Sequence, residues 1–508
     1  MRSKKALYNI ISNLFLQIII IIYGFIVPKI IIQNFGSNVN GLISSITQFL
    51  GYITLLESGF GPVVRAALYK PLAQKNKKEL SNILKTSERF FRKIAYIFII
   101  YIMILCILYP LIVSNDFNYL YTISLIIIIS ISTFAEYFFG MTYRMFLQAN
   151  QQNYIISIIQ IMAYILNIVI IIAIVKIGAN IHVIKLATAL IFIFRPLLQN
   201  IYVHKKYKID LQKADSNYNI KQKWEALSQH IAAVVNGNTD IAILTIFTNL
   251  KYVSIYSVYY LVIKGINSIM QAFNNGIDAS FGDMIAKKEY DNLNRKFKIY
   301  EISCFTISTI VYSCAIVLIT PFIFVYTKGI NDANYIQFWF GFLLVISQYI
   351  WAIRLPYSSL IMASGHFKET RNGAWIEAFS NIIISIILVW KYGIIGVTIG
   401  TIISMLIRTI EFIYHSNRFI LNRKISESIK KILLLIVQTL LIVIICHKVP
   451  YLDNLSYFQW FINALITGTI AAILVLFINF IFYREDIKNL INILKKITIK
   501  KCNTRNIE

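Results

Sequence analysis

The chain has 508 residues, of which 57% are hydrophobic and 14% charged, and its formal net charge is +26 at pH 7. A soluble globule of this size needs far more polar surface, so the composition excludes water as the main solvent. The positive charge would suggest nucleic acid binding in a soluble protein. In a membrane protein, orientation in the bilayer and contact with anionic membrane lipids explain it better, and we expect no nucleic acid partner.

Apolar stretches long enough to cross a bilayer recur along the whole chain. A spanning helix needs about 20 mostly apolar residues, and because these runs do not alternate polar with apolar residues they predict helices and not a β-barrel. The expected fold class is an all-α integral membrane protein with about fourteen transmembrane helices. In chain order the predicted spans are 7–32, 40–64, 94–114, 119–141, 154–176, 181–203, 227–249, 252–278, 300–326, 334–362, 373–391, 394–417, 430–449 and 457–483.

The basic residues orient these spans, because cytoplasmic loops carry an excess of Lys and Arg. The basic start and the long first apolar run predict a retained signal anchor with a cytoplasmic N-terminus. In that orientation most basic residues fall in cytoplasmic segments, and the outer loops hold five: Lys176, Lys251, Lys328, Lys391 and Lys448. We therefore expect both the N- and C-termini in the cytoplasm.

The long polar linker after the sixth span divides the chain into two sets of six spans with the same orientation, which suggests two parallel halves. The predicted boundaries are an N-terminal six-helix bundle at 1–203, a cytoplasmic linker at 204–226, a C-terminal six-helix bundle at 227–417, an additional helix pair at 418–483 and a basic amphipathic cytoplasmic tail at 484–508. Apolar residues at helical spacing near 80–91 and 293–297 predict two further helices lying on the inner leaflet.

The sequence lacks the signatures of several enzyme and pump classes. Its outer loops are too short for a catalytic domain, and it contains no phosphate-binding G-x-x-x-x-G-K-[ST] loop, H-E-x-x-H or D-x-D motif. Its five cysteines form no C-x-x-C pair and indicate neither a disulfide framework nor a metal site. We expect a transporter and not an enzyme, with no catalytic residues, no metal and no cofactor.

Ionisable side chains inside the spans are costly in hydrocarbon, so each is a candidate for a cavity or a functional site. Guanidinium and ammonium groups bind phosphate oxygens strongly where water is scarce. The candidate ligands of a substrate diphosphate are Arg354, Lys264, Arg195 and Arg408. The candidates for cavity-lining polar groups or for ion coupling are Asp240, Glu57, Asn236, Asn381 and Glu377.

Structural pairing is the alternative for these charges. Arg408 and Glu411 are spaced i,i+3 on one helix, and Lys264 and Asp240 lie on adjoining helices, so each cation can instead pair with a carboxylate and hold helices together. Glu57 lies among small residues that permit close packing, which favours a structural role for it. The residues alone leave both interpretations open.

Several short motifs, taken together with their order and spacing, are characteristic. They include LESGFG at 56–61, NTD at 238–240, RLPY at 354–357 and GHFKET at 365–370. Through them the chain resembles the Wzx-type polysaccharide flippases of the multidrug/oligosaccharidyl-lipid/polysaccharide exporter superfamily. The related lipid II flippases bind diphosphate with arginines of the first bundle. Here that bundle offers chiefly Arg195, so the assignment does not transfer residue by residue.

The resemblance implies two six-helix bundles that form a V around a central cavity and alternate between inward- and outward-open states. It also implies the substrate, a polyprenyl-diphosphate-linked oligosaccharide carried from the inner to the outer leaflet of the bacterial cytoplasmic membrane. The product would serve capsule, exopolysaccharide or a related surface glycan. The implied transport unit is a monomer, with glycan polymerase and glycosyltransferases of the same pathway as partners.

Two other functions stay open at this point. A cation-coupled drug or small-solute antiporter of the same fold would depend on buried acids such as Asp240, Glu57 and Glu136. A membrane-embedded glycan polymerase would need a substantial outer loop with catalytic groups, and none of the outer loops is long enough. Because no ATPase motif is present, transport against a gradient would need a proton, a sodium ion or the membrane potential, with Asp240 or Glu57 as the titrating group.

Overall fold

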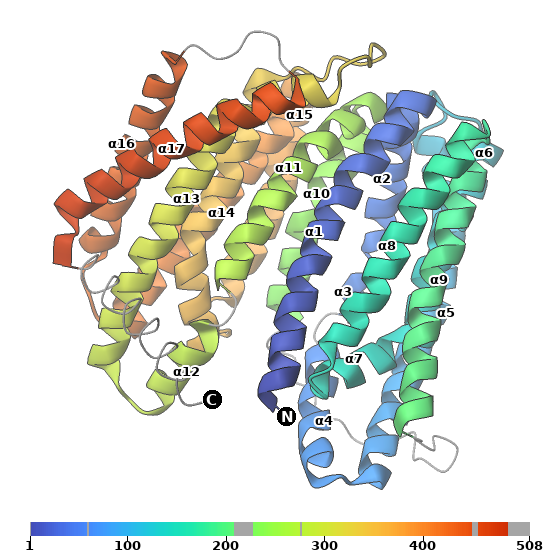
Figure 1. Ribbon diagram of the computed structural model, residues 1–508, viewed down its shortest axis with the longest axis horizontal. Coiled ribbons are helices and arrows are strands. Elements are labelled where there is room, and N and C mark those ends of the chain that lie inside the picture. The colour runs from blue at the N-terminus through green and yellow to red at the C-terminus, as the bar shows by residue number, and fades with distance from the viewer. Residues whose placement is uncertain (1, 58–59, 208–226, 275–276, 450–455, 486–508) are drawn as a thin grey trace. The chain divides into compact units, whose positions relative to one another are not determined.

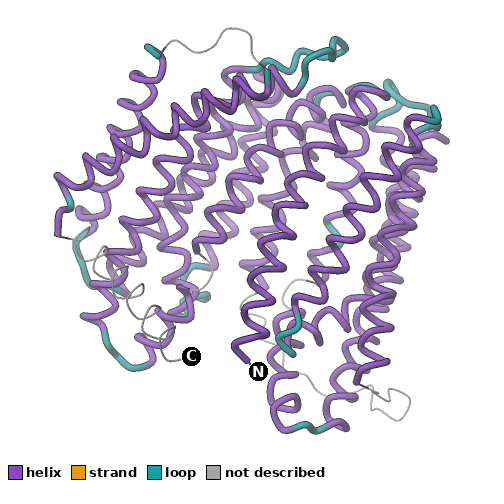
Figure 2. The backbone as a smooth tube through the Cα atoms, viewed as in Figure 1, coloured by secondary structure: helices purple, strands orange, loops and turns teal. Residues whose placement is uncertain are grey.

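The computed structural model describes residues 2–57, 60–207, 227–274, 277–449 and 456–485, and within these ranges all regular secondary structure is helical (Figure 2). Twelve of the described helices are long and apolar enough to cross a membrane. One of them, Arg371–Ile420, covers two predicted spans, and α10 (Leu227–Phe247) corresponds to a further one. The predicted all-α membrane fold with about fourteen spans is therefore confirmed.

The chain forms two compact units, each described here by itself. Unit 1 comprises Met1–Leu261 and Gly329–Ala333, and unit 2 comprises Val262–Lys328 and Asn334–Glu508. The division passes through α11 (Leu250–Asn274). The boundaries that the sequence suggests, with a linker at 204–226, remain predictions, and most of that linker and of the tail lies outside the described residues.

In unit 1, long helices pack side by side, with α1 against α8 and α6 against α9 (Figure 1). The elements of this unit before α10 are α1 (Arg2–Phe35), α2 (Ser37–Gly51), α3 (Thr54–Glu57), α4 (Phe60–Gln74), α5 (Lys77–Ile112), α6 (Tyr119–Ala135), the π-helix η1 (Glu136–Gly140), α7 (Met141–Ala149), α8 (Asn153–Lys176) and α9 (Ile181–Tyr207). Single-turn π-helices are often found at functional sites, which draws attention to η1 and its Glu136.

Two local expectations are corrected in unit 1. The span predicted at 40–64 is not one helix: α2 ends at Gly51, where Tyr52 and Ile53 donate backbone hydrogen bonds to the carbonyls three residues back, which tightens and stops the turn. The surface helix predicted near 80–91 is instead the start of α5, which is capped by Asn76 and continues unbroken to Ile112. At this start of α5, the apolar side chains of Leu80, Ile83, Leu84 and Phe91 are buried inside the unit.

Unit 2 is built around α13, which packs against α14, α16 and α17. After α11 its elements are α12 (Ile277–Ala286), α13 (Tyr290–Tyr326), α14 (Phe338–Ser364), α15 (Arg371–His415), the π-helix η3 (Ser416–Ile420), α16 (Ile425–His447) and α17 (Tyr457–Phe482). The second surface helix predicted near 293–297 is likewise wrong, because Leu293 and Phe297 are buried and belong to the continuous helix α13.

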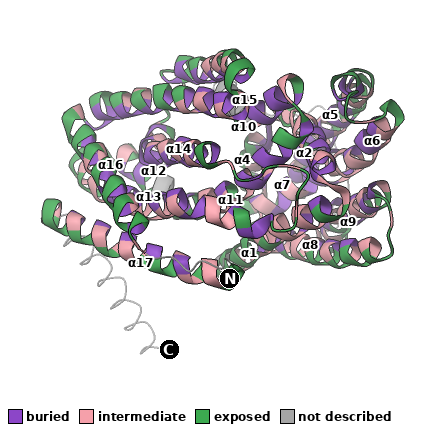
Figure 3. Cartoon of the chain, turned by 90° about the horizontal axis from the view of Figure 1, so that it is seen from above, coloured by how far each residue is buried: buried purple, intermediate pink, exposed green. Residues whose placement is uncertain are grey.

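Exposed residues run along the outward faces of α16 and α17 (Figure 3), and many of them are large and apolar, such as Leu433 and Phe477. Between the two helices, a small apolar cluster of Ile442, Cys446, Ala471 and Val475 is fully buried. A soluble protein rarely exposes apolar patches of this extent. The pattern is that of helices whose inner faces pack on protein and whose outer faces meet lipid.

Helix α15 is a hairpin of two helices joined at one residue. Gly393 has φ 54° and ψ −130°, a conformation that breaks the helix between the predicted spans 373–391 and 394–417. The two halves then pack closely: a Cβ at Gly400 would lie 2.8 Å from the backbone nitrogen of Ser385, and the Ser385 hydroxyl donates to the Val397 carbonyl at 3.2 Å. Small residues allow this close approach, and it brings polar groups of both halves together.

Candidate functional site

Four charged side chains of α14 and α15 form a continuous cluster in unit 2, which we call the α14–α15 charge cluster. Arg354 Nη1 lies 2.6 Å from Glu377 Oε1, and Arg408 Nε lies 3.6 Å from Glu377 Oε2. Arg408 Nη1 also lies 2.5 Å from Glu411 Oε2. The cluster therefore alternates in sign along Arg354, Glu377, Arg408 and Glu411, and its formal charge is zero.

The close packing of the α15 hairpin holds this cluster in place. Arg408 donates to the backbone carbonyl of Thr370 at 2.7 Å, and its guanidinium carbon lies 4.2 Å from the centre of the Phe412 ring. At Gly373 the backbone runs directly past the Glu411 carboxylate, so that a Cβ there would overlap it. Arg408 is thus fixed by carboxylates, a carbonyl and an aromatic ring, which is the setting of a structural arginine.

Accessibility differs strongly within the cluster. The side chain of Arg408 is 2% exposed, whereas those of Arg354 and Glu411 are 14% and 28% exposed. A ligand can therefore reach Arg354 and Glu411 before it can reach Arg408. Because the cluster is neutral, an anion would bind by taking the place of a carboxylate on Arg354, and a cation by joining Glu411.

Asn381 extends the same polar stripe one turn beyond Glu377. Its side-chain amide donates to the hydroxyls of Thr401 at 3.1 Å and Ser404 at 3.4 Å across the hairpin. Asn381 is fully buried. The geometry shows helix-to-helix hydrogen bonds at this position, where the sequence suggested a group lining a cavity or coupling an ion.

The four predicted cations have different surroundings within their own units. Lys264, on α11, is exposed and makes no hydrogen bond or ion pair with another described residue. Arg195 belongs to unit 1, where its guanidinium carbon lies 4.2 Å from the centre of the Phe192 ring and its Nε donates to the Phe192 carbonyl at 3.4 Å. Of these four cations, Arg354 and Arg408 belong to the α14–α15 charge cluster.

The predicted acids of unit 1 each accept a tyrosine hydroxyl. Tyr256 donates to buried Asp240 at 2.8 Å, and Tyr137 of η1 donates to Glu57 at 2.9 Å. Beside Tyr137, Glu136 pairs with Arg144 at 3.3 Å. The side chain of Asn236 lies outside the described residues. The first contact satisfies the buried carboxylate of Asp240, and the second satisfies the half-buried carboxylate of Glu57, as hydrocarbon surroundings require.

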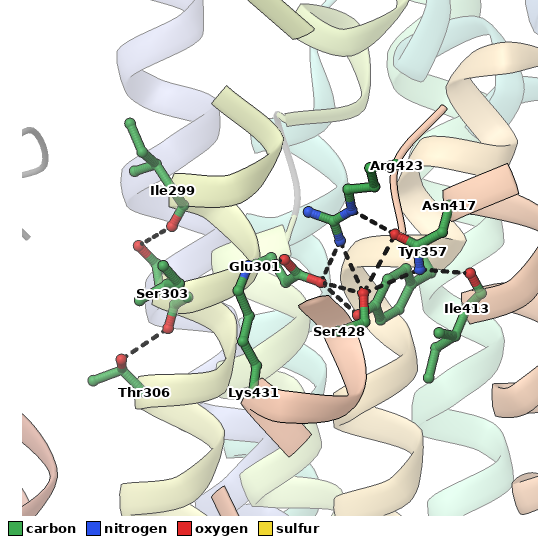
Figure 4. Close-up of polar contacts among 11 residues, drawn as sticks. Ile299, Glu301, Ser303, Thr306, Tyr357, Ile413, Asn417, Arg423, Ser428 and Lys431 are labelled. Atoms are coloured by element: carbon green, nitrogen blue, oxygen red, sulfur yellow. Dashed lines mark hydrogen bonds and ion pairs between the residues drawn. The ribbon is translucent and has the colours of Figure 1, made fainter. Parts of the chain in front are cut away.

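A second ionic cluster in unit 2 was missed by the sequence analysis. The Glu301 carboxylate lies 2.7 Å from Arg423 Nη2, is also paired with Lys431, and accepts hydrogen bonds from Tyr357 at 2.5 Å and Ser428 at 3.1 Å (Figure 4). Arg423 further donates to Asn417. Glu301 is fully buried, so this Glu301 cluster ties α13 to α14, to α16 and to the segment before α16.

One sequence signal could have found this cluster. Glu301 and Lys431 have opposite charges, and each lies within two residues of the cytoplasmic start of a predicted span. Charges at such places are usually solvated at the membrane interface, so the sequence gives no reason to pair them. Only the packing of α16 against α13 brings them into contact.

The fold and its buried charges define a polytopic helical membrane protein. No protein-family model and no curated protein matches the chain in sequence. Solved structures do match it. A structure described as lipid II flippase MurJ in an inward closed conformation aligns with a TM-score of 0.72 at 16% identity, over 94% of this chain and 99% of that chain.

Two structures of multidrug resistance MATE family transporters of the MOP superfamily also align. The inward-facing one has a TM-score of 0.57 at 12% identity, over 83% of this chain and 99% of that chain. The outward-facing one has a TM-score of 0.56 at 15% identity, over 84% of this chain and 96% of that chain. At such identities the likeness establishes the fold, which this chain shares with MurJ and the MATE transporters.

Proposed function

We propose that this protein is a flippase of the Wzx type, which moves a polyprenyl-diphosphate-linked oligosaccharide between leaflets of the bacterial cytoplasmic membrane by alternating access. The observation that carries the proposal is the match to the MurJ structure over 94% of the chain, whereas the MATE structures leave about a sixth of it unmatched. The short motifs at 56–61, 238–240, 354–357 and 365–370 resemble those of Wzx-type flippases, and this resemblance supports an oligosaccharide-linked substrate.

In this proposal Arg354 is the first ligand of the diphosphate. It is the more accessible arginine of the α14–α15 charge cluster, and its partner Glu377 also lies near Arg408. When a diphosphate oxygen replaces Glu377 as the partner of Arg354, Glu377 therefore stays paired with Arg408. The exchange leaves no buried charge without a counter-ion. Exposed Lys264 is the second cation of the proposed site.

The test is transbilayer movement of a polyprenyl-diphosphate oligosaccharide in vesicles that contain the purified protein. We expect Arg354→Ala to reduce the rate at least about tenfold, the loss of one charge-assisted hydrogen bond to the substrate. We expect Lys264→Ala to reduce it less. Arg371→Ala, which removes an exposed arginine from the first turn of α15, is the matched control and should leave the rate unchanged.

The antiporter is the second candidate, because MATE structures share the fold and Asp240 is buried against Tyr256. It predicts no lipid movement and a cation or dye exchange that Asp240→Asn abolishes. Lipid movement by the wild type that is insensitive to Arg354→Ala would leave the flippase standing but remove Arg354 from its site. Absence of lipid movement together with ion-coupled exchange would replace the flippase proposal.

A further inference from the structure

A basic hollow lies on α5 at the place where this helix changes from polar to apolar. Six residues line it, and they succeed one another at helical spacing: Lys85, Glu88, Arg89, Arg92, Lys93 and Tyr96. The hollow has a volume of about 370 Å³, which falls in the range of small-molecule sites. Among these described residues, four are cations and one is a carboxylate, so the described part of the wall is basic.

The wall is held in shape by contacts inside unit 1. Glu88 is buried and pairs with Lys85 at 3.3 Å and with Arg92 at 2.6 Å. The Arg92 guanidinium carbon lies 5.0 Å from the centre of the Phe138 ring, and the same ring packs edge-on against Tyr96. Arg89 and Lys93, one turn apart, are exposed at the surface of the helix.

The same face of α5 continues as an apolar surface. Beyond Tyr96, itself 56% exposed, the exposed residues along the helix are Ile97, Ile100, Met103, Ile104, Ile107, Leu108 and Leu111. A tyrosine at such a boundary marks the membrane interface, with hydrocarbon on one side and headgroups on the other. The basic hollow is thus at headgroup depth, directly below a surface that accepts an acyl chain.

We propose that the hollow is a binding site for the phosphate headgroup of an anionic membrane phospholipid, whose acyl chain lies along the apolar face of α5. A phosphodiester is complementary in charge to these basic side chains, and Arg and Lys at i,i+4 spacing reach its oxygens from two sides. The site is in unit 1, shares no residue with the α14–α15 charge cluster of unit 2, and does not depend on the transported substrate.

The test compares thermal unfolding of the purified protein in detergent with added phosphatidylglycerol, phosphatidylcholine, polyprenyl diphosphate or inorganic phosphate, and counts retained lipids by native mass spectrometry. We expect phosphatidylglycerol to raise the melting temperature more than phosphatidylcholine does. The double variant Arg89→Ala with Lys93→Ala should lose this difference, with an affinity reduced about 30-fold, since each basic group near a membrane surface contributes about a factor of five.

Two matched variants separate a specific site from general attraction. Arg89→Lys with Lys93→Arg keeps the charge and should keep the effect, and Lys287→Ala with Lys288→Ala, which removes two exposed lysines of unit 2, should also keep it. Equal stabilisation by both phospholipids would overturn the proposal. Full stabilisation by inorganic phosphate would also overturn it, because this would indicate a site for a free anion. Stabilisation by polyprenyl diphosphate but not by phosphatidylglycerol would overturn it as well, because this would indicate a substrate site.

Discussion

Unit 2 contains two clusters of arginine, lysine and glutamate that share chemistry and differ in access. In the Glu301 cluster a fully buried carboxylate meets two cations, and its remaining lone pairs accept hydroxyls of Tyr357 and Ser428. In the α14–α15 charge cluster, Arg354 and Glu411 stay partly exposed while Arg408 is enclosed. Residue type is thus a poor guide to role in a membrane protein. Burial and the number of hydrogen-bond and ion-pair partners distinguish a charge that holds helices together from a charge that can bind a ligand.

The largest expected effect is on the Glu301 cluster. Glu301→Gln leaves Lys431 and Arg423 buried without a full counter-charge, and we expect it to cost about 3–5 kcal/mol of stability. A thermal unfolding series in detergent measures the loss. Adding Lys431→Met should restore a substantial part of it, because the double variant removes one of the stranded charges. A single variant as stable as the wild type would contradict the structural role of the cluster.

A smaller effect is expected where the α15 hairpin closes. Gly400→Ala places a methyl group against the backbone of Ser385, so we expect a loss of about 1–3 kcal/mol from overpacking. Gly265→Ala is the matched control, because this glycine of α11 has open space around it, and there alanine should be neutral or stabilising by about 0.5–1 kcal/mol. If both variants had the same sign in thermal unfolding, the close approach of the two helices would be refuted.

The smallest stability effect is expected for Arg354→Ala. Glu377 keeps Arg408 as a partner, so no carboxylate is stranded, and we expect a loss of about 1 kcal/mol. Its transport defect should be far larger than this loss explains, whereas Glu301→Gln should reduce transport only in proportion to the folded fraction. Parallel measurements of melting temperature and transport per folded molecule distinguish the two clusters. A loss of stability comparable with that of Glu301→Gln would make Arg354 a structural residue.

Hydrophobic length predicted the membrane fold and the order of the spans, because nothing except a helix satisfies the backbone over such runs. The break at Gly393 was also predicted, since a charged and glycine-containing step at 391–393 interrupts the apolar pattern. The end of α2 at Gly51 was not, because it arises from a local tightening of the backbone within an apolar run.

The candidate site was predicted in part. The pairing of Arg408 with Glu411 follows from i,i+3 spacing, and the structure contains it. The contact of Arg354 with Glu377 depends on how α14 packs against α15, which residue spacing does not encode. For the same reason the sequence did not pair Glu301 with Arg423 and Lys431, which lie more than 100 residues further along the chain.

The single-residue join at Gly393 has a consequence for how the chain enters the membrane. Because no loop separates the two spans, we expect 371–392 and 394–415 to insert into the bilayer together, as one hairpin. Glu377 then enters together with Arg408 and Glu411 of the facing helix, and Arg354 arrives on the preceding span. Each of these charges would be costly alone in hydrocarbon, but here they enter as ion pairs. The hairpin therefore lowers the free-energy cost of inserting this charged segment into the membrane.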